Sequence, residues 1–170
     1  MRIDSTKYGN GSGAIIAKKG NTYYVLTAGH VVKNPDNYKL TTPDGEQYKI
    51  DNRAVKIFEG VDLAVVPFIS QKSYQIATFA DYNPIWGAGE SMVFVSGFPK
   101  DSLPKRKLTA GYGFPTSGAS LSAYNAYSLT NGYELVYSNF SQPGMSGAPV
   151  LDSLGRVVGI NAATEVRGNN

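Results

Sequence analysis

The chain has 170 residues, of which 42% are hydrophobic and 17% are charged, and its net charge is +3. This length and composition are typical of one globular domain and exclude a largely disordered protein. The densest basic stretch, residues 100–107, contains no aromatic residue, which favours a solvated hairpin over a nucleic-acid interface. No apolar run approaches the ~20 residues of a membrane span. We therefore expect neither nucleic acid nor a membrane as a partner.

Cysteine is absent and histidine occurs once, at His30. The sequence therefore predicts no disulfide framework, and a zinc site is not expected because the ligands that zinc prefers are missing. We expect no metal and no cofactor. The lack of cysteine favours a reducing interior or a bacterial origin, and residues 1–5 do not resemble an apolar leader. The expected location is cytoplasmic, although the chain could also be one domain of a longer protein, with other domains as partners.

Short apolar runs rich in Val, Ile and Tyr alternate with clusters of Gly, Pro, Asn and Asp, a pattern that predicts an all-β protein. Strands of this kind suit a sandwich or a pair of small barrels. Residues 71–89 are interpreted as a connection between two halves, and a helical turn is expected over residues 31–33. The predicted strands cover residues 14–18, 23–27, 38–42, 47–58, 63–68, 91–96, 107–112, 133–138, 148–151 and 157–162.

His30 follows an apolar segment that ends in small residues, Leu26-Thr27-Ala28-Gly29. Small residues beside an imidazole leave room for a substrate and let the ring reach a neighbouring hydroxyl. Histidine is also the side chain that most readily gains and loses a proton near neutral pH. We therefore interpret His30 as a candidate general base; a packed or surface histidine is the alternative.

Ser146 lies between glycines in the segment Gly144-Met145-Ser146-Gly147. The glycines permit a tight turn that directs the hydroxyl outward and lets other backbone approach closely. Such a turn can also point the amides of Gly144 and Ser146 into one concavity, which is the arrangement that stabilises a tetrahedral oxyanion. An ordinary turn before a strand is the alternative for this segment.

Asp62 stands at the start of a strongly apolar strand, Asp62-Leu63-Ala64-Val65. A carboxylate in such a position is unfavourable unless it has a partner. An imidazole would be a suitable partner, because the carboxylate would select the tautomer whose other nitrogen can accept a serine proton. A strand-end or turn aspartate is the alternative.

The order His30, Asp62, Ser146 is that of the chymotrypsin fold and differs from the order in subtilisins and α/β-hydrolases. With the segments around these residues, the sequence resembles the trypsin-like peptidase family in its compact, cysteine-free bacterial form. The resemblance covers nearly the whole chain. The segments that carry it are Gly11-Ser12-Gly13-Ala14-Ile15-Ile16, Thr27-Ala28-Gly29-His30, Asp62-Leu63-Ala64-Val65, Gly144-Met145-Ser146-Gly147-Ala148-Pro149-Val150 and Gly155-Arg156-Val157-Val158-Gly159-Ile160.

The resemblance implies one peptidase domain over residues 1–170, made of two six-stranded antiparallel barrels with the active site in the cleft between them. The N-terminal barrel would cover about 1–75 and the C-terminal barrel about 90–165. The implied catalytic triad is His30, Asp62 and Ser146, and the implied oxyanion hole consists of the Gly144 and Ser146 amides.

Two positions depart from the family pattern. Animal members have an aspartate directly before the nucleophile, where it pairs with a newly cleaved N-terminus. That position is Met145 here, so activation through such an ion pair is not expected. Ala148 replaces the second glycine after the nucleophile, a change that the fold should tolerate.

The resemblance also implies the residues that bind the substrate's primary side chain. None of them is acidic and none is histidine, so we expect an uncharged side chain there. The implied substrate-binding residues are Phe140, Ser141, Asn161, Ala162, Ala163 and Thr164.

The sequence therefore predicts a serine endopeptidase that hydrolyses a protein or peptide substrate through an acyl-enzyme. Two alternatives stay open. One is a catalytically silent module that keeps the protease fold and binds proteins. The other is an esterase or acyl transferase that uses the same three residues.

Overall fold

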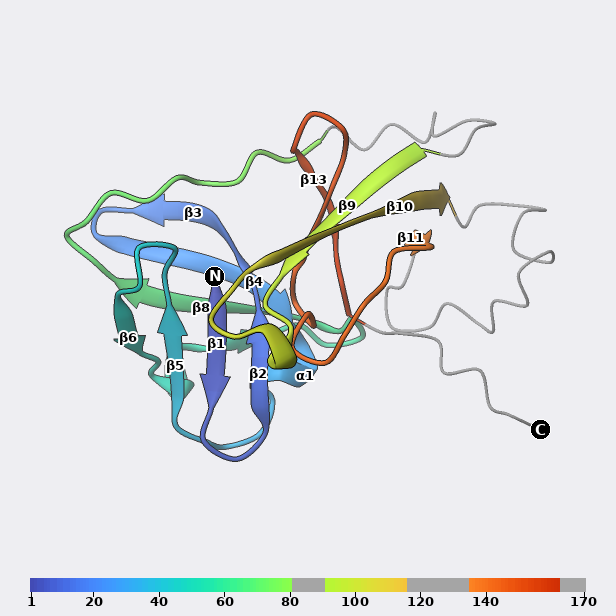
Figure 1. Cartoon of the computed structure of the whole chain (residues 1–170). Coiled ribbons are helices and arrows are strands. Elements are labelled where there is room, and N and C mark those ends of the chain that lie inside the picture. The colour runs from blue at the N-terminus through green and yellow to red at the C-terminus, as the bar shows by residue number, and fades with distance from the viewer. Residues whose placement is uncertain (81–90, 116–134, 163–170) are drawn as a thin grey trace.

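The strands form three antiparallel sheets in the computed structural model, which describes residues 1–80, 91–115 and 135–162 (Figure 1). The first half of the chain contributes two sheets of four strands, and the second half contributes one sheet of five strands. The predicted all-β, chymotrypsin-type fold is confirmed. The predicted six strands in each barrel are not confirmed, because the first half has eight strands in its two sheets and part of the second half lies outside the described residues.

The two sheets of the first half are built from pairs of strands that alternate along the chain. One has the order β2-β1-β5-β6 and the other the order β3-β4-β8-β7. A helical turn, α1 (Gly29–Val32), follows β4. The bounds are β1 (Arg2–Ser5), β2 (Gly9–Ser12), β3 (Ala14–Lys19), β4 (Thr22–Ala28), β5 (Tyr38–Thr41), β6 (Gln47–Lys49), β7 (Lys56–Ile57) and β8 (Leu63–Ile69).

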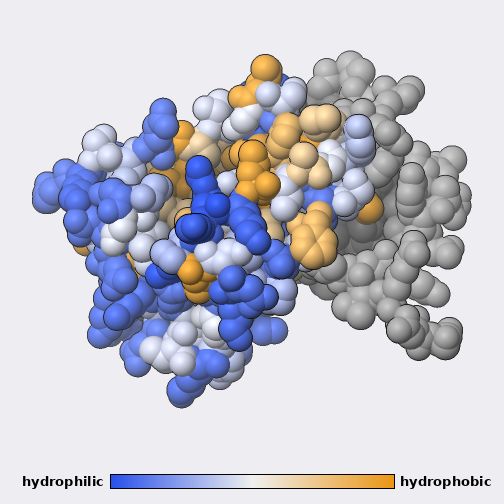
Figure 2. All heavy atoms as spheres, in the orientation of Figure 1, coloured by the Kyte–Doolittle hydropathy of each residue, from blue (hydrophilic) through white to orange (hydrophobic). Residues whose placement is uncertain are grey.

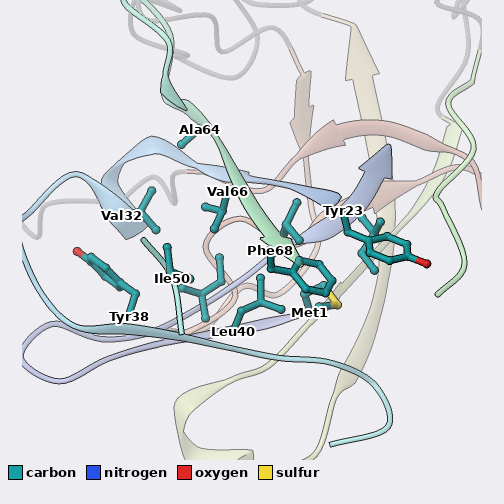
Figure 3. Close-up of a cluster of buried hydrophobic side chains, with 12 residues drawn as sticks. Met1, Tyr23, Val32, Tyr38, Leu40, Ile50, Ala64, Val66 and Phe68 are labelled. Atoms are coloured by element: carbon teal, nitrogen blue, oxygen red, sulfur yellow. The ribbon is translucent and has the colours of Figure 1, made fainter. Parts of the chain in front are cut away.

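The core of the first half follows from the alternation of side chains along β4 and β8. Alternate residues of each strand, among them Tyr23 and Val25 of β4 and Val66 and Phe68 of β8, are buried. These side chains converge between the sheets, as Figure 3 shows. The rings of Tyr23 and Phe68 stack with their centroids 5.3 Å apart. Burial of these large apolar side chains is the main source of stability in this half.

The second half forms a sheet with the order β11-β10-β9-β12-β13 around a smaller buried cluster. The cluster consists of Val93, Val95, Met145, Ala148 and Val150. Figure 2 shows hydrophilic side chains over most of the first half on this face, whereas hydrophobic ones gather over strands of the second half. The bounds are β9 (Ser91–Gly97), β10 (Lys107–Pro115), β11 (Leu135–Tyr137), β12 (Pro149–Leu151) and β13 (Val157–Ile160).

Two features of the first half differ from the sequence-based expectation. The predicted strand 47–58 is interrupted after β6 by a short 3₁₀ turn, η1 (Asn52–Ala54), because the Asp51 side chain accepts a hydrogen bond from the backbone of Arg53 and caps the turn. The hairpin of β1 and β2 was not predicted. Its Gly-Asn-Gly-Ser strand has no β-forming pattern, and its pairing with β1 depends on β5, whose Leu40 lies opposite Ile3.

The predicted connection between the halves is described only up to residue 80. Residues 71–80 contain no strand apart from an isolated bridge between Phe79 and Val157. Residues 81–89 lie outside the described residues. In the part of the chain that the structure describes, no helix is both long and apolar enough to cross a membrane.

Candidate active site

The register of β4 against β8 brings His30 and Asp62 together. Ala28, the last residue of β4, pairs with Leu63, the first residue of β8. The next residues beyond this pair, Gly29 and Asp62, are therefore side by side, and the Gly29 amide donates to the Asp62 carbonyl at 3.1 Å. The turn of α1 then places His30 over the Asp62 side chain.

Both oxygens of the Asp62 carboxylate contact His30. Oδ1 accepts a hydrogen bond from the His30 backbone amide at 2.8 Å, and Oδ2 lies 2.7 Å from the imidazole Nδ1. An ionised carboxylate only accepts hydrogen bonds, so Nδ1 must carry the proton in this contact. The neutral ring then presents Nε2 as an acceptor. The arrangement suits a general base whose tautomer is set by its carboxylate partner.

A glycine-dependent loop presents Ser146. Gly144 has a φ of 95° and stands in a turn closed by the bond from the Met145 amide to the Gln142 carbonyl, 3.0 Å long. Gly147 has a φ of 83°, and a Cβ there would lie 2.1 Å from the Ser12 carbonyl oxygen. The sequence-based explanation of these glycines, a tight turn and a close backbone approach, agrees with both observations.

His30 and Ser146 line one cavity of about 320 Å³. Its walls come from the β1–β2 hairpin, from α1, and from the loop before Ser146. The cavity is lined by Ile3, Ser5, Tyr8, Gly9, Asn10, Gly11, His30, Val31, Lys100, Pro143, Gly144 and Ser146.

The backbone amides of Gly144 and Ser146 donate to no acceptor within the ranges that the structure describes. The carbonyl of Pro143 accepts from the Lys100 amide at 2.8 Å. In a trans peptide the C=O and N–H point in opposite directions, so this bond turns the Gly144 N–H away from the Lys100 amide. The Gly144 and Ser146 N–H groups therefore have no acceptor in the described part of the chain.

Met145, the residue directly before Ser146, is fully buried among Val93, Val95 and Val150. Its carbonyl accepts from the Asn161 side-chain amide at 2.9 Å and from the Ala148 backbone amide at 3.0 Å. Met145 stands where animal members of the trypsin-like family that the sequence resembles have an aspartate. Apolar packing and hydrogen bonds hold Met145 in place.

The implied substrate-binding residues lie in different settings. Asn161 is buried, and its side-chain amide donates to the Ser141 hydroxyl at 3.1 Å, so these two are brought together. Phe140 is 69% exposed and Ala162 is half-buried. Neither they nor Asn161 and Ser141 line the cavity described above. Ala163 and Thr164 lie outside the described residues.

Ser12, Asn10 and Lys100 contact the site although no role was predicted for them from the sequence. Ser12 contacts the loop before Ser146 through its backbone and side chain, and Asn10 donates to the Phe98 carbonyl at 2.8 Å. The segment Gly11-Ser12-Gly13 offered a weak signal, since paired glycines often mark close backbone approach. Within the described part of the chain, no group of three or more acidic or histidine residues could hold a metal ion.

Comparison with known proteins identifies the family. The sequence profile of the trypsin-like peptidase domain matches residues 11–160. The chain is 28% identical over 161 residues to the serine protease Do-like HtrA of Bacillus subtilis (strain 168), covering 94% of this chain and 34% of that protein. It is 28% identical over 160 residues to a serine protease HtrA-like protein of Staphylococcus aureus (strain bovine RF122 / ET3-1), covering 90% of this chain and 20% of that protein. The chain therefore spans about a third or less of these relatives.

Solved structures show the same fold. The HtrA-type protease AlgW with tripeptide matches with a TM-score of 0.75 and 22% identity, over 98% of this chain and 51% of that one. Deg5 matches with a TM-score of 0.69 and 21% identity, over 96% of this chain and 78% of that one. Because the sequence profile covers most of the chain, and the sheets and loops described above agree with it, this chain belongs to the trypsin-like peptidase family.

Proposed function

We propose that the chain is a serine endopeptidase domain that cleaves peptide bonds through an acyl-enzyme. Ser146 attacks the scissile carbonyl while His30 Nε2 accepts the hydroxyl proton. The protonated imidazole then donates that proton to the leaving amine, and a water molecule repeats the sequence to release the acid. Asp62 orients the ring and stabilises its positive charge throughout.

The observation that carries this proposal is the double contact of Asp62 with His30, together with a serine that lines the same cavity as His30. The 2.7 Å contact at Nδ1 accounts for the tautomer that general-base catalysis needs. A histidine that merely packed in the core would not line a cavity with a glycine-flanked serine.

The loop before Ser146 supports a role for backbone amides in binding the oxyanion. The Gly144 and Ser146 N–H groups have no acceptor among the described residues, and the Pro143 carbonyl is held by Lys100. Each oxyanion donor of this kind is worth on the order of 3 kcal/mol in the transition state.

The proposed substrate is a protein or peptide. The acyl part would extend past Ser141 and Asn161, with an uncharged primary side chain, and the leaving part would enter the cavity beside His30. A peptide-bound structure of AlgW supports peptide binding for that relative. Since the chain spans 34% of the Bacillus protein, other domains could belong to the same protein, and their effect on activity is part of the proposal. A cytoplasmic location is likewise proposed only from composition.

The test is to treat the protein with a fluorophosphonate probe and locate the adduct by peptide mass spectrometry. We expect one adduct, on Ser146, and turnover of a peptide library as well as of matched alkyl esters, whose bonds are intrinsically easier to cleave. A protein that binds peptides without labelling would support the silent binding module instead. Labelling with ester turnover alone would support the esterase.

A further inference from the structure

We propose that Ser12 is a positioning residue that holds the oxyanion loop, residues 142–147, from the opposite half of the molecule. The inference rests on the proposed function, and it assigns to that site a residue 134 positions before the nucleophile (146 minus 12). Ser12 is the last residue of β2 and is 1% exposed.

The Ser12 hydroxyl bridges two segments of the second half. It accepts a hydrogen bond from the Phe98 amide at 2.9 Å and donates one to the Gly144 carbonyl at 2.8 Å. A serine hydroxyl can do both at once because it has one proton and two lone pairs. The side chain thus ties the residue after β9 to the oxyanion loop.

The backbone of Ser12 makes two further contacts at the same place. Its amide donates to the Ser146 carbonyl at 2.7 Å, and its carbonyl accepts from the Thr27 hydroxyl at 2.7 Å. Gly147 packs so closely here that a Cβ would lie 2.1 Å from both the Ser12 carbonyl and the Thr27 hydroxyl oxygens. The loop therefore contacts Ser12 directly.

Four consecutive carbonyls of the loop have partners outside its own turn. Lys100 holds the Pro143 carbonyl and Asn161 holds that of Met145, while Ser12 holds those of Gly144 and Ser146. Each carbonyl fixes the tilt of its own peptide plane. Along the loop, the two peptide planes that carry the Gly144 and Ser146 N–H groups therefore alternate with two planes whose carbonyls Ser12 holds.

This alternation of peptide planes explains why the Ser12 side chain matters for catalysis and not only for stability. The Gly144–Met145 plane joins the two oxyanion donors, and only the Ser12 hydroxyl holds its carbonyl among the described residues. The Met145 amide of the same plane donates to the Gln142 carbonyl inside the turn, so without the Ser12 bond the plane is held on that side alone and can tilt, which changes the angle between the donors. The transition state depends on that angle more strongly than the bound substrate does.

The experiment compares Ser12→Ala with Ser70→Ala as a matched control. Ser70 is also a buried serine, and its hydroxyl also has two partners, Tyr48 and the Lys72 amide, but neither partner belongs to the oxyanion loop. Both variants lose two hydrogen bonds of a buried hydroxyl. The measurements are kcat, KM, thermal unfolding and the affinity for a peptide boronate, which forms a tetrahedral adduct on the serine oxygen.

For Ser12→Ala we expect kcat to fall about 10- to 100-fold and KM to change by less than about threefold. Affinity for the boronate should fall in parallel with kcat. Ser70→Ala should unfold at a lower temperature with wild-type kcat and boronate affinity. If Ser12→Ala does not fold, Ser12→Cys keeps the size with a weaker hydrogen-bonding group and should give a smaller fall in kcat.

Wild-type kcat and boronate affinity in a folded Ser12→Ala or Ser12→Cys variant would overturn the role of Ser12 while the proposed function stands. A wild-type protein that neither turns over peptides nor binds the boronate would overturn both. Equal loss of kcat in Ser12→Ala and Ser70→Ala would reduce the effect of Ser12 to general stability and would also overturn it.

Discussion

Asp62 holds His30 at two points: Oδ1 accepts from the backbone amide at 2.8 Å, and Oδ2 contacts ring Nδ1 at 2.7 Å. The first contact fixes the start of the α1 turn and the second fixes the ring on that turn. Gly29 is part of the same arrangement, because a Cβ there would lie 3.1 Å from Asp62 Oδ1. One carboxylate therefore sets both the backbone and the tautomer of the proposed general base.

Replacement of Asp62 by asparagine should lower kcat by about 10³- to 10⁴-fold, because an amide presents a donor where two acceptors are needed. The measurement is steady-state peptide hydrolysis with purified enzyme. Asp152→Asn is a matched control, since Asp152 also accepts from backbone amides, those of Leu154 and Arg156, but does not line the cavity. An Asp62→Asn enzyme within tenfold of wild type would contradict the assigned role.

Ser146→Ala should abolish peptide hydrolysis and change the free energy of unfolding by less than about 1 kcal/mol. The reason is that the Ser146 hydroxyl has no hydrogen-bond partner within the described ranges, so its removal leaves no group unsatisfied. Phosphonate labelling should disappear in the same variant. Retained turnover would show that another residue is the nucleophile.

Met145→Ala should lower the free energy of unfolding by about 2–5 kcal/mol, because Met145 is fully buried in the second core cluster. Met145→Leu conserves volume and should lose less than about 1.5 kcal/mol. Urea unfolding of both variants checks the prediction. If the two variants were equally stable, packing at this position would not hold the loop.

Gly147→Ala should prevent formation of the active loop. The alanine would need a φ of 83° and would place Cβ 2.1 Å from two oxygen atoms, those of Ser12 and Thr27. The left-handed conformation alone costs of order 1–3 kcal/mol, and the overlap adds to it. Gly155→Ala is the control: it has a φ of 77°, but no atom lies within 4 Å of its Cβ position. Wild-type activity in Gly147→Ala would contradict the close approach.

Lowering the pH should destabilise the first half of the chain, because the carboxylates of Asp36 and Asp44 become protonated. Desolvation would raise the pKa of Asp36, but hydrogen bonds from Ser5, Thr6 and the Lys7 amide outweigh it and lower that pKa. The hydroxyl of Thr42, followed by Lys72, lowers the pKa of Asp44 to about 2. A lowered folded-state pKa stabilises the protein above the unfolded value of about 3.9, and this contribution is lost as the pH falls below it.

We therefore expect the melting temperature to fall between about pH 4 and pH 2, and the fall to be shallower in an Asp36→Asn, Asp44→Asn double variant. Calorimetry across this pH range measures both. Parallel melting profiles for the two proteins would contradict the contribution of these carboxylates.

The candidate catalytic residues could be predicted from the sequence because each stands in a distinctive local segment. His30 after small residues, Asp62 at the head of an apolar strand and Ser146 between glycines each have a signal within a few positions. Alternation along 23–27 and 63–68 likewise predicted β4 and β8, because burial on one face of a strand repeats every second residue.

The tertiary structure decided what depends on partners distant in the chain. The hydroxyl of Ser12 bonds the Gly144 carbonyl 132 positions away, and the local Gly11-Ser12-Gly13 pattern indicated a close backbone approach but not which segment approaches. The hairpin of β1 and β2 forms because β5 supplies a neighbour for Ile3, and not because its own residues favour strands. Hydrogen bonds and close contacts between distant segments leave no pattern in the local sequence, because the two segments meet only when the chain folds.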